Sequence, residues 1–174
     1  SEFFIFVYVF PSFFLLLTFF PFSTRYNRFY NIHINYWFQI FLFANSFILF
    51  IITHIDFVIY YLLDNQYYFK RDGIYGYYDD AERFAFFSRA VLEMIPYIDF
   101  KPDIIHCNDW QTALTPLYYS SMYASSPGYE NIKTVFTIHN IQYQGTYGKE
   151  LINEVLGIPQ SATSLIEYDG DVNF

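Results

Sequence analysis

Hydrophobic and polar positions follow different patterns in two parts of this chain. Up to about residue 63, apolar residues run with few interruptions, and the only charged residues before Asp64 are Glu2, Arg25, Arg28 and Asp56. From Phe57 onward, short apolar runs alternate with stretches whose apolar residues recur every three or four positions. Short runs are typical of buried strands, and the longer spacing is typical of amphipathic helices.

The second part predicts an alternating series of strands and helices. The expected strands are Phe57–Leu62, Asp103–Cys107 and Lys133–Ile138, and the expected helices are about Asp80–Ile95, Trp110–Tyr123 and Lys149–Leu156. A loop is expected over Gln66–Tyr78, a bend at Pro116 and a helix end at Gly157. This alternation predicts an α/β fold built on a doubly wound parallel sheet, with all three strands parallel and the last two buried.

The helix predicted over residues 80–95 has the clearest signals. Asp79 is a plausible N-cap, and Glu82 follows three residues later, as in a capping box. Pro96 sets its end, because the residue before a proline avoids the helical region. Its apolar residues fall on one face, at Phe84, Phe87, Val91 and Ile95.

Residues 1–56 form an atypical apolar segment with several interpretations. Ser1–Phe22 and Tyr36–Leu63 each reach the length of about 20 residues that a membrane-spanning helix needs. Pro11 and Asp56 interrupt them, and a signal peptide's basic start is missing. A second interpretation is a frame error, because an AT-rich gene read out of frame yields much Phe, Ile, Tyr and Asn and little Gly. An unusual soluble core is the third.

Composition narrows the classes of function. A chain of 174 residues is long enough for one domain with a core. The net charge of −8 disfavours a nucleic-acid partner, which would require clustered Lys and Arg. Cys107 is the single cysteine, so neither a disulfide framework nor a cysteine-based zinc site is expected, and a reducing cytoplasmic location is the natural setting.

Two polar clusters follow predicted strands at the place where α/β sheets bind ligands. That place lies beyond the carboxyl ends of the strands. The clusters are His106, Asn108 and Asp109 at the end of the strand Asp103–Cys107, and His139, Asn140 and Gln142 after the strand Lys133–Ile138. The chain has no Gly-x-Ser-x-Gly elbow, phosphate-binding P-loop or zinc-spaced histidine pair, which disfavours serine hydrolysis, NTPase chemistry and metal hydrolysis. Sugar chemistry stays open.

Each candidate residue also has a plain structural interpretation. Asp109 could cap the helix that follows it, and His139 with Asn140 could form a hydrogen-bonded turn. His106 could be a structural residue at a strand end. Tyr75 and its tyrosine neighbours could pack on the surface or form a platform for a sugar ring. Cys107 is expected to be a small buried hydrophobe.

Three blocks of the sequence resemble bacterial glycogen synthases and plant starch synthases. The blocks are YYFKRDGIYGYYDDAERFAFFSRAVLE, DIIHCNDWQTAL and TVFTIHNIQYQGTYG, in that order, and the resemblance covers about residues 57–174. It implies a GT-B glycosyltransferase, with this stretch as a Rossmann-like part of the amino-terminal domain. It also implies transfer of glucose from ADP-glucose to the non-reducing end of an α-1,4-glucan, with retention and without a metal or other cofactor.

The resemblance also implies roles for individual residues. Asp109 and His139 correspond to residues that line the donor glucose and are the catalytic candidates, and Tyr75 corresponds to an active-site tyrosine. Asn140, Gln142 and His106 are further substrate-binding candidates. A carboxylate and oriented dipoles near the anomeric carbon would stabilise an oxocarbenium-like transition state.

Departures from the family pattern imply an incomplete enzyme. The family's glycine-rich loop is missing, because no glycine precedes Gly73, and the sequence stops before the family's second domain. The chain is thus expected to be a partial starch synthase catalytic domain that is inactive alone. The alternatives are a sucrose-synthase-like GT-B enzyme and a membrane-anchored, non-catalytic glucan-binding module, the latter only if residues 1–63 are genuine. A plant-type source would change the expected location to the plastid.

Overall fold

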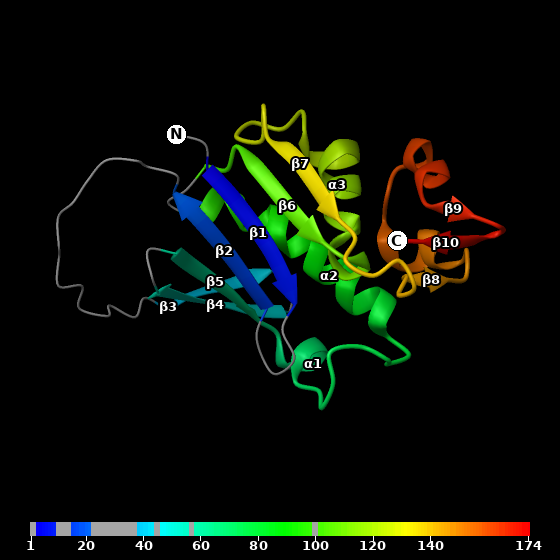
Figure 1. The fold of residues 1–174 in the computed structure, drawn as a ribbon, viewed down its shortest axis with the longest axis horizontal. Helices are drawn as coiled ribbons and strands as arrows, with labels where there is room; N and C mark the ends of the chain where they lie inside the picture. The colour runs from blue at the N-terminus through cyan, green and yellow to red at the C-terminus, as the bar shows by residue number, and fades with distance from the viewer. Residues whose placement is uncertain (1–2, 10–14, 22–37, 44–45, 56–57, 99–100) are drawn as a thin grey trace. The chain divides into compact units, whose positions relative to one another are not determined.

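The chain folds as two compact units, Ser1–Ile74 and Tyr75–Phe174. The computed structural model describes residues 3–9, 15–21, 38–43, 46–55, 58–98 and 101–174 (Figure 1). Across these ranges, no helix combines the length and apolar character that crossing a membrane requires.

The first unit contains an antiparallel arrangement of strands in the order β3-β4-β5-β2-β1. A short helix, α1 (Gln66–Phe69), follows the last strand, and Asn65 caps it by accepting a hydrogen bond from the Tyr68 amide at 3.1 Å. This helix lies within the predicted loop Gln66–Tyr78. The strands are β1 (Phe3–Val9), β2 (Leu15–Pro21), β3 (Phe38–Phe43), β4 (Ser46–Ile55) and β5 (Val58–Asp64).

β5 corresponds to the predicted strand Phe57–Leu62, whose first residue lies outside the described ranges. The expected parallel pairing of this strand is wrong, because β5 pairs antiparallel with both β2 and β4. The chain itself explains the difference. Ile55 at the end of β4 pairs with Val58 at the start of β5, and so short a connection joins neighbouring strands only in an antiparallel sense.

The second unit contains the parallel pair that the sequence predicts. β6 (Ile104–Asn108) and β7 (Lys133–Thr137) run parallel, with His106 opposite Val135. Helices α2 (Asp80–Glu93) and α3 (Leu114–Tyr118) lie along one face of this pair (Figure 1). A small antiparallel sheet at the carboxyl end has the order β8-β10-β9, with β8 at Thr146–Tyr147, β9 at Glu167–Tyr168 and β10 at Asp171–Asn173.

α2 confirms the predicted helix and its apolar face. It ends at Glu93, and a 3₁₀ turn, η1 (Ile95–Tyr97), carries the chain through Pro96. All four residues of the predicted face are buried: Phe84, Phe87, Val91 and Ile95. Asp79 stands at the predicted N-cap position but makes no side-chain capping hydrogen bond, so that part of the capping-box prediction is wrong.

The helix predicted over Trp110–Tyr123 consists of three short pieces. These are the 3₁₀ turn η2 (Trp110–Thr112), α3, and the π-helical turn η3 (Tyr119–Tyr123). Pro116 lies in the first turn of α3, where a backbone N–H has no intrahelical partner in any case. The last predicted helix forms the π-helical turn η4 (Ile152–Leu156), which ends at Gly157 with φ of 60°, and the 3₁₀ segment η5 (Gln160–Leu165) follows.

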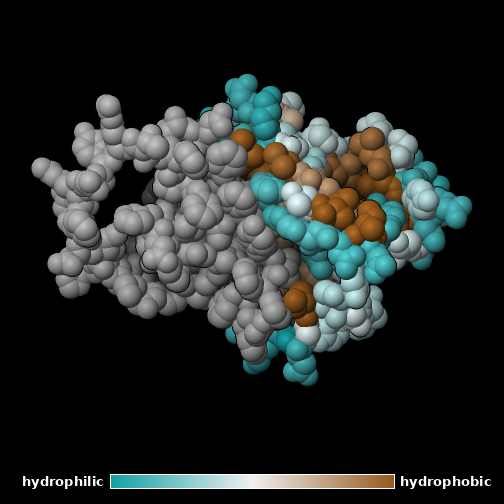
Figure 2. Space-filling view, in the orientation of Figure 1, coloured by the Kyte–Doolittle hydropathy of each residue, from teal (hydrophilic) through white to brown (hydrophobic). Residues whose placement is uncertain are grey.

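The two parallel strands differ in burial. β6 is a core strand, since Ile105 and Cys107 are fully buried. β7 was expected to be buried, but Val135 and Phe136 are 43% and 40% exposed. Figure 2 shows brown apolar surface among the teal polar side chains. The large exposed apolar residues of the second unit include Val135, Phe136, Ile138, Ile141 and Tyr143.

Candidate functional site

The site begins at Asp109, directly after β6. Its amide donates to the Thr137 carbonyl at 2.9 Å, which extends the ladder between β6 and β7 by one bond. Its backbone then turns into η2 with φ of 58° and ψ of 174°. This combination lies in a region that is almost restricted to glycine. The turn is braced by Thr112, whose hydroxyl donates to the Asp109 carbonyl at 3.2 Å.

The carboxylate of Asp109 points to the second predicted cluster. Its Oδ1 accepts a hydrogen bond from the backbone amide of His139 at 2.7 Å. It makes no capping bond to η2, so the interpretation of Asp109 as a side-chain helix cap is wrong. Two residues that are thirty positions apart in sequence thus meet at the carboxyl end of the parallel pair, as the strand order predicts.

The imidazole of His139 is held by a member of the first polar cluster that received no predicted role. Its Nε2 lies 3.0 Å from Oδ1 of Asn108, a buried side chain at the last position of β6. With the amide oxygen facing the ring, Nε2 is the nitrogen that donates, and Nδ1 of a neutral ring is free to accept. Asn108 lies within the first polar cluster, and that position was the signal for it.

His106 on β6 forms a side-chain hydrogen bond to β7. Its Nε2 lies 2.7 Å from the hydroxyl of Thr137 on β7, and its side chain is half-buried. Burial, together with the nearby imidazole of His139, lowers the pKa of His106. The contact with Thr137 favours a structural role, in which His106 supports the strand end that carries His139.

Asn140 and Gln142 lie in the loop after β7. The Asn140 side chain accepts from the Gln142 amide at 3.0 Å, and the Asn140 carbonyl accepts from the Tyr143 amide at 3.2 Å. Asn140 therefore shapes the turn, whereas Gln142 is exposed on it. The sequence allowed a hydrogen-bonded turn at His139 and Asn140. The turn instead begins at Asn140, and the His139 side chain contacts Asn108.

Tyr75 approaches this site through an aromatic neighbour. Tyr75 is 45% exposed, and the centre of its ring lies 6.1 Å from that of Trp110, the residue after Asp109. It also lies 6.3 Å from the ring of Tyr143 in the loop after β7. Tyr78 is 94% exposed, and the Tyr77 ring lies 5.1 Å from the Arg83 guanidinium, so of the tyrosines near Gly76, Tyr75 is the one that faces the site's own residues.

A separate hollow lies at the other end of β6. It has a volume of about 420 Å³, and Pro96, Lys101 and Tyr129 are among its lining residues. Lys101 precedes β6, whereas Asp109 follows it, so the hollow is not part of the site. In the described ranges, no group of three or more His, Cys, Asp and Glu side chains could hold a metal ion.

Comparison with known proteins identifies the family. A family model described as the starch synthase catalytic domain matches residues 19–174. This chain belongs to the starch synthase catalytic domain family. The match begins within the atypical apolar segment, ahead of the blocks that carry the resemblance, and it covers the whole candidate site.

Individual relatives agree with the family. A starch synthase family member from Desulforamulus reducens, named glycogen synthase, is 50% identical over 121 residues, which cover 68% of this chain and 25% of that protein. A glycogen synthase from Alkaliphilus metalliredigens is 52% identical over 117 residues, 66% of this chain and 25% of its own length. The chain therefore spans about a quarter of the length of these relatives.

A solved structure supports the fold. The catalytic domain of Starch Synthase IV from Arabidopsis thaliana, bound to ADP and acarbose, aligns with a TM-score of 0.61 and 28% identity. The alignment covers 86% of this chain and 32% of that one. The predicted family and fold class, an α/β part of a GT-B glycosyltransferase, are confirmed. The sucrose-synthase-like and non-catalytic alternatives are not favoured.

Proposed function

We propose that this chain supplies part of the sugar site of a glucan synthase. The whole enzyme would transfer glucose from ADP-glucose to the non-reducing end of an α-1,4-glucan with retention. Membership of the starch synthase family supports the reaction, and the structural neighbour bound to ADP and acarbose supports a nucleotide and a sugar as ligands. The reducing cytoplasm suits the buried thiol of Cys107.

The bond between Asp109 and the His139 amide carries this proposal. It fixes a carboxylate at the carboxyl end of two parallel strands, the edge at which α/β proteins bind ligands. A carboxylate with a fixed position stabilises positive charge that develops on a sugar ring in the transition state, because it does not have to reorient. Asp109 would therefore act electrostatically.

His139 and Asn108 would act as oriented polar groups. Asn108 holds the imidazole through Nε2, so Nδ1 and the ring face remain for a ligand. His139 is exposed in the described structure, and Asn108 behind it is buried. This arrangement suits a hydrogen bond to a sugar hydroxyl, with Asn108 as the supporting residue. Tyr75, Asn140 and Gln142 would contribute to the walls of the same site.

A graft tests the proposal within a complete enzyme. Residues 58–174 would replace the matching stretch of the Desulforamulus reducens glycogen synthase, and incorporation of labelled glucose from ADP-glucose into glycogen would be measured. The graft is expected to be active. Asp109→Ala in the graft should lower kcat about 10²–10³-fold, the usual cost of one preorganised electrostatic group.

Glu154→Ala is the matched control, since Glu154 is an exposed carboxylate on η4. It should leave the rate within about twofold of the unsubstituted graft, as expected for a surface substitution. A folded graft that keeps its full rate after Asp109→Ala would contradict the proposed role of Asp109.

A further inference from the structure

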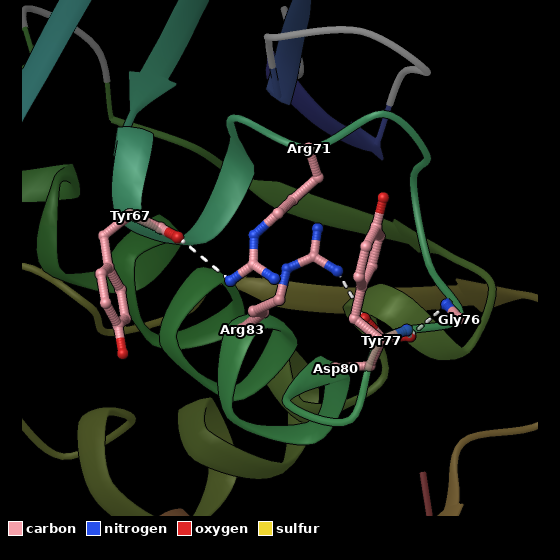
Figure 3. Close-up of polar contacts among 6 residues, drawn as sticks. All are labelled: Tyr67, Arg71, Gly76, Tyr77, Asp80 and Arg83. Carbon is pink, nitrogen blue, oxygen red and sulfur yellow. Dashed lines mark hydrogen bonds and ion pairs between the residues drawn. The ribbon is translucent and has the colours of Figure 1, made fainter.

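Asp80, at the start of α2, has a buried carboxylate with three hydrogen-bond donors around it. Its Oδ2 accepts from the amides of Gly76 at 2.5 Å and Tyr77 at 3.0 Å, and its Oδ1 pairs with the guanidinium of Arg83 (Figure 3). Asp80 is 4% exposed and Arg83 is 2% exposed. A buried carboxylate is costly unless it is paired and hydrogen-bonded, so these contacts strongly constrain its position.

The two backbone amides that Asp80 accepts from belong to the preceding loop rather than to the helix. An acidic residue in a first helical turn commonly serves the unpaired amides of its own helix. Asp80 instead reaches back to residues three and four positions earlier. The backbone reinforces the turn, since the Asp80 amide donates to the Tyr77 carbonyl at 3.2 Å and Gly76 has φ of 100°. A Cβ at Gly76 would meet no atom within 4 Å, so backbone conformation is what requires glycine there.

The residue before this turn is Tyr75, whose ring is packed on two sides. The Trp110 ring meets it nearly edge-on, at 74°, and the Tyr143 ring at 58°. Trp110 is itself buried against Phe84, at 4.9 Å between ring centres, and Phe84 follows Arg83 in α2. The first turns of α2 therefore anchor both the loop that carries Tyr75 and the ring on which Tyr75 rests.

We infer that Asp80 is a positioning residue that holds the Tyr75 ring against Trp110 as a face for stacking a glucose unit of an α-glucan chain. The sugar part of this inference rests on the proposed function. Asp80 acts through the Gly76–Tyr77 turn and touches no substrate. A half-exposed tyrosine with fixed ring neighbours suits this task, because it offers an apolar face at little cost in side-chain entropy.

Fluorescence of Trp110 tests the positioning without any assay of activity. In a Trp37→Phe background, Trp110 is the single tryptophan. Tyr75→Ala should increase acrylamide quenching of Trp110 by removing the ring beside it. Asp80→Asn should cause a similar increase, because an amide has one acceptor oxygen and cannot serve three donors. Gly76→Ala should do the same by straining the turn while the ion pair stays intact.

The double variant Asp80→Asn with Tyr75→Ala decides whether Asp80 acts through Tyr75. The inference expects no more quenching than Tyr75→Ala alone produces. A full additive increase, or no effect of either Asp80→Asn or Gly76→Ala, would overturn it. Val91→Ala is the stability control, since Val91 is buried in α2 well after the turn. It should lower the unfolding midpoint and leave quenching unchanged.

Binding of maltoheptaose by affinity electrophoresis tests the sugar part separately. Tyr75→Ala and Asp80→Asn should each weaken binding about tenfold, equivalent to about 1.4 kcal/mol, whereas Val91→Ala should not. Coupled quenching with no maltoheptaose binding by the unsubstituted chain would overturn the glucan role of Tyr75 while the positioning role stands, and the proposed sugar site would still be tested by the graft. Binding that survives Tyr75→Ala would overturn Tyr75 as the stacking face.

Discussion

Asp109 combines an unfavourable backbone with a useful side chain. Its φ and ψ belong to a region where non-glycine residues cost about 1–3 kcal/mol, and such residues persist where their surroundings fix them. Here the Thr137 carbonyl, the His139 amide and the Thr112 hydroxyl all bond to Asp109. A glycine would adopt this turn more easily, but it would leave the His139 amide without its carboxylate.

Two substitutions of Asp109 separate the backbone from the side chain. Asp109→Ala loses the hydrogen bond and keeps the strain, so it should lower the free energy of unfolding by about 1 kcal/mol or more. Asp109→Gly loses the same bond and relieves the strain, so it should be about 1 kcal/mol more stable than Asp109→Ala. Urea unfolding followed by circular dichroism measures both.

Ala113→Gly is the control for this comparison, because Ala113 has an ordinary helical φ of −64°. Glycine there should destabilise by about 0.5–1 kcal/mol. Equal stability of the two Asp109 variants would show that the turn is not strained.

His106 should make stability depend on pH. Its pKa is lowered in the folded chain, so below the unfolded value of about 6.5 the unfolded chain binds more protons than the folded one. Stability should therefore be complete above about pH 7 and fall as the pH drops through 6.5 toward the lowered folded value. His106→Gln can still bond to Thr137 but does not titrate. The urea midpoint of His106→Gln should fall less between about pH 7 and 5.5 than that of the unsubstituted chain. Equal slopes of midpoint against pH in the two proteins would refute this role of His106.

At the scale of elements, β7 is an end strand with apolar side chains at the surface. Within the described ranges, β7 is the last strand at one edge of its sheet. Val135 and Phe136 on it are about two-fifths exposed. Apolar strands of parallel sheets are normally covered on both faces. An exposed edge of this composition pairs readily with other chains, which makes self-association a direct physical consequence.

Val135→Lys should therefore reduce self-association of the chain, because a charged side chain opposes pairing at an open edge. Light scattering at increasing protein concentration measures the effect. Ser120→Lys adds the same charge at an exposed position of η3 and should change scattering far less. Equal reductions in both variants would point to net charge rather than to β7.

Local signals predicted the elements better than their partners. The apolar face of α2 and the parallel pair β6 and β7 follow from spacing and from strand–helix alternation. The pairing of β5 does not, because its neighbours β2 and β4 come from a segment without readable turn signals. The exposure of β7 was missed because an apolar run predicts burial but does not show whether another element of the chain covers the strand.

The site was predictable to the same extent. Strand ends and parallel order brought Asp109 and His139 together as expected. Asn108 was placed in a polar cluster but given no role, because its contact with the His139 ring has no signature in the spacing of residues. Asp80 was hidden by its neighbour Asp79, which matches a capping pattern that the side chains do not follow.

At the scale of the whole molecule, the 174-residue polypeptide spans about a quarter of its glycogen synthase relatives. We expect it to show no measurable glucose transfer from ADP-glucose to glycogen when purified alone. Asp109 is partly exposed and His139 is exposed, so both contact water, where electrostatic interactions are weak. Radiolabelled glucose in glycogen is the measure, with Asp109→Ala as the background. Transfer above that background would show that this polypeptide is a complete catalyst.

The bond between Asp109 and His139 also has a consequence for how the site assembles during folding. Its two partners come together only when the crossover between β6 and β7 has closed. That closure costs chain entropy before the contacts between the two strands can form. Helix α2 and the turn held by Asp80 involve neighbours within a few residues and need no such closure. The Gly76–Tyr77 turn can thus organise early from local contacts, whereas the Asp109 carboxylate and the ring contacts of Tyr75 with Trp110 and Tyr143 must wait for the long-range topology.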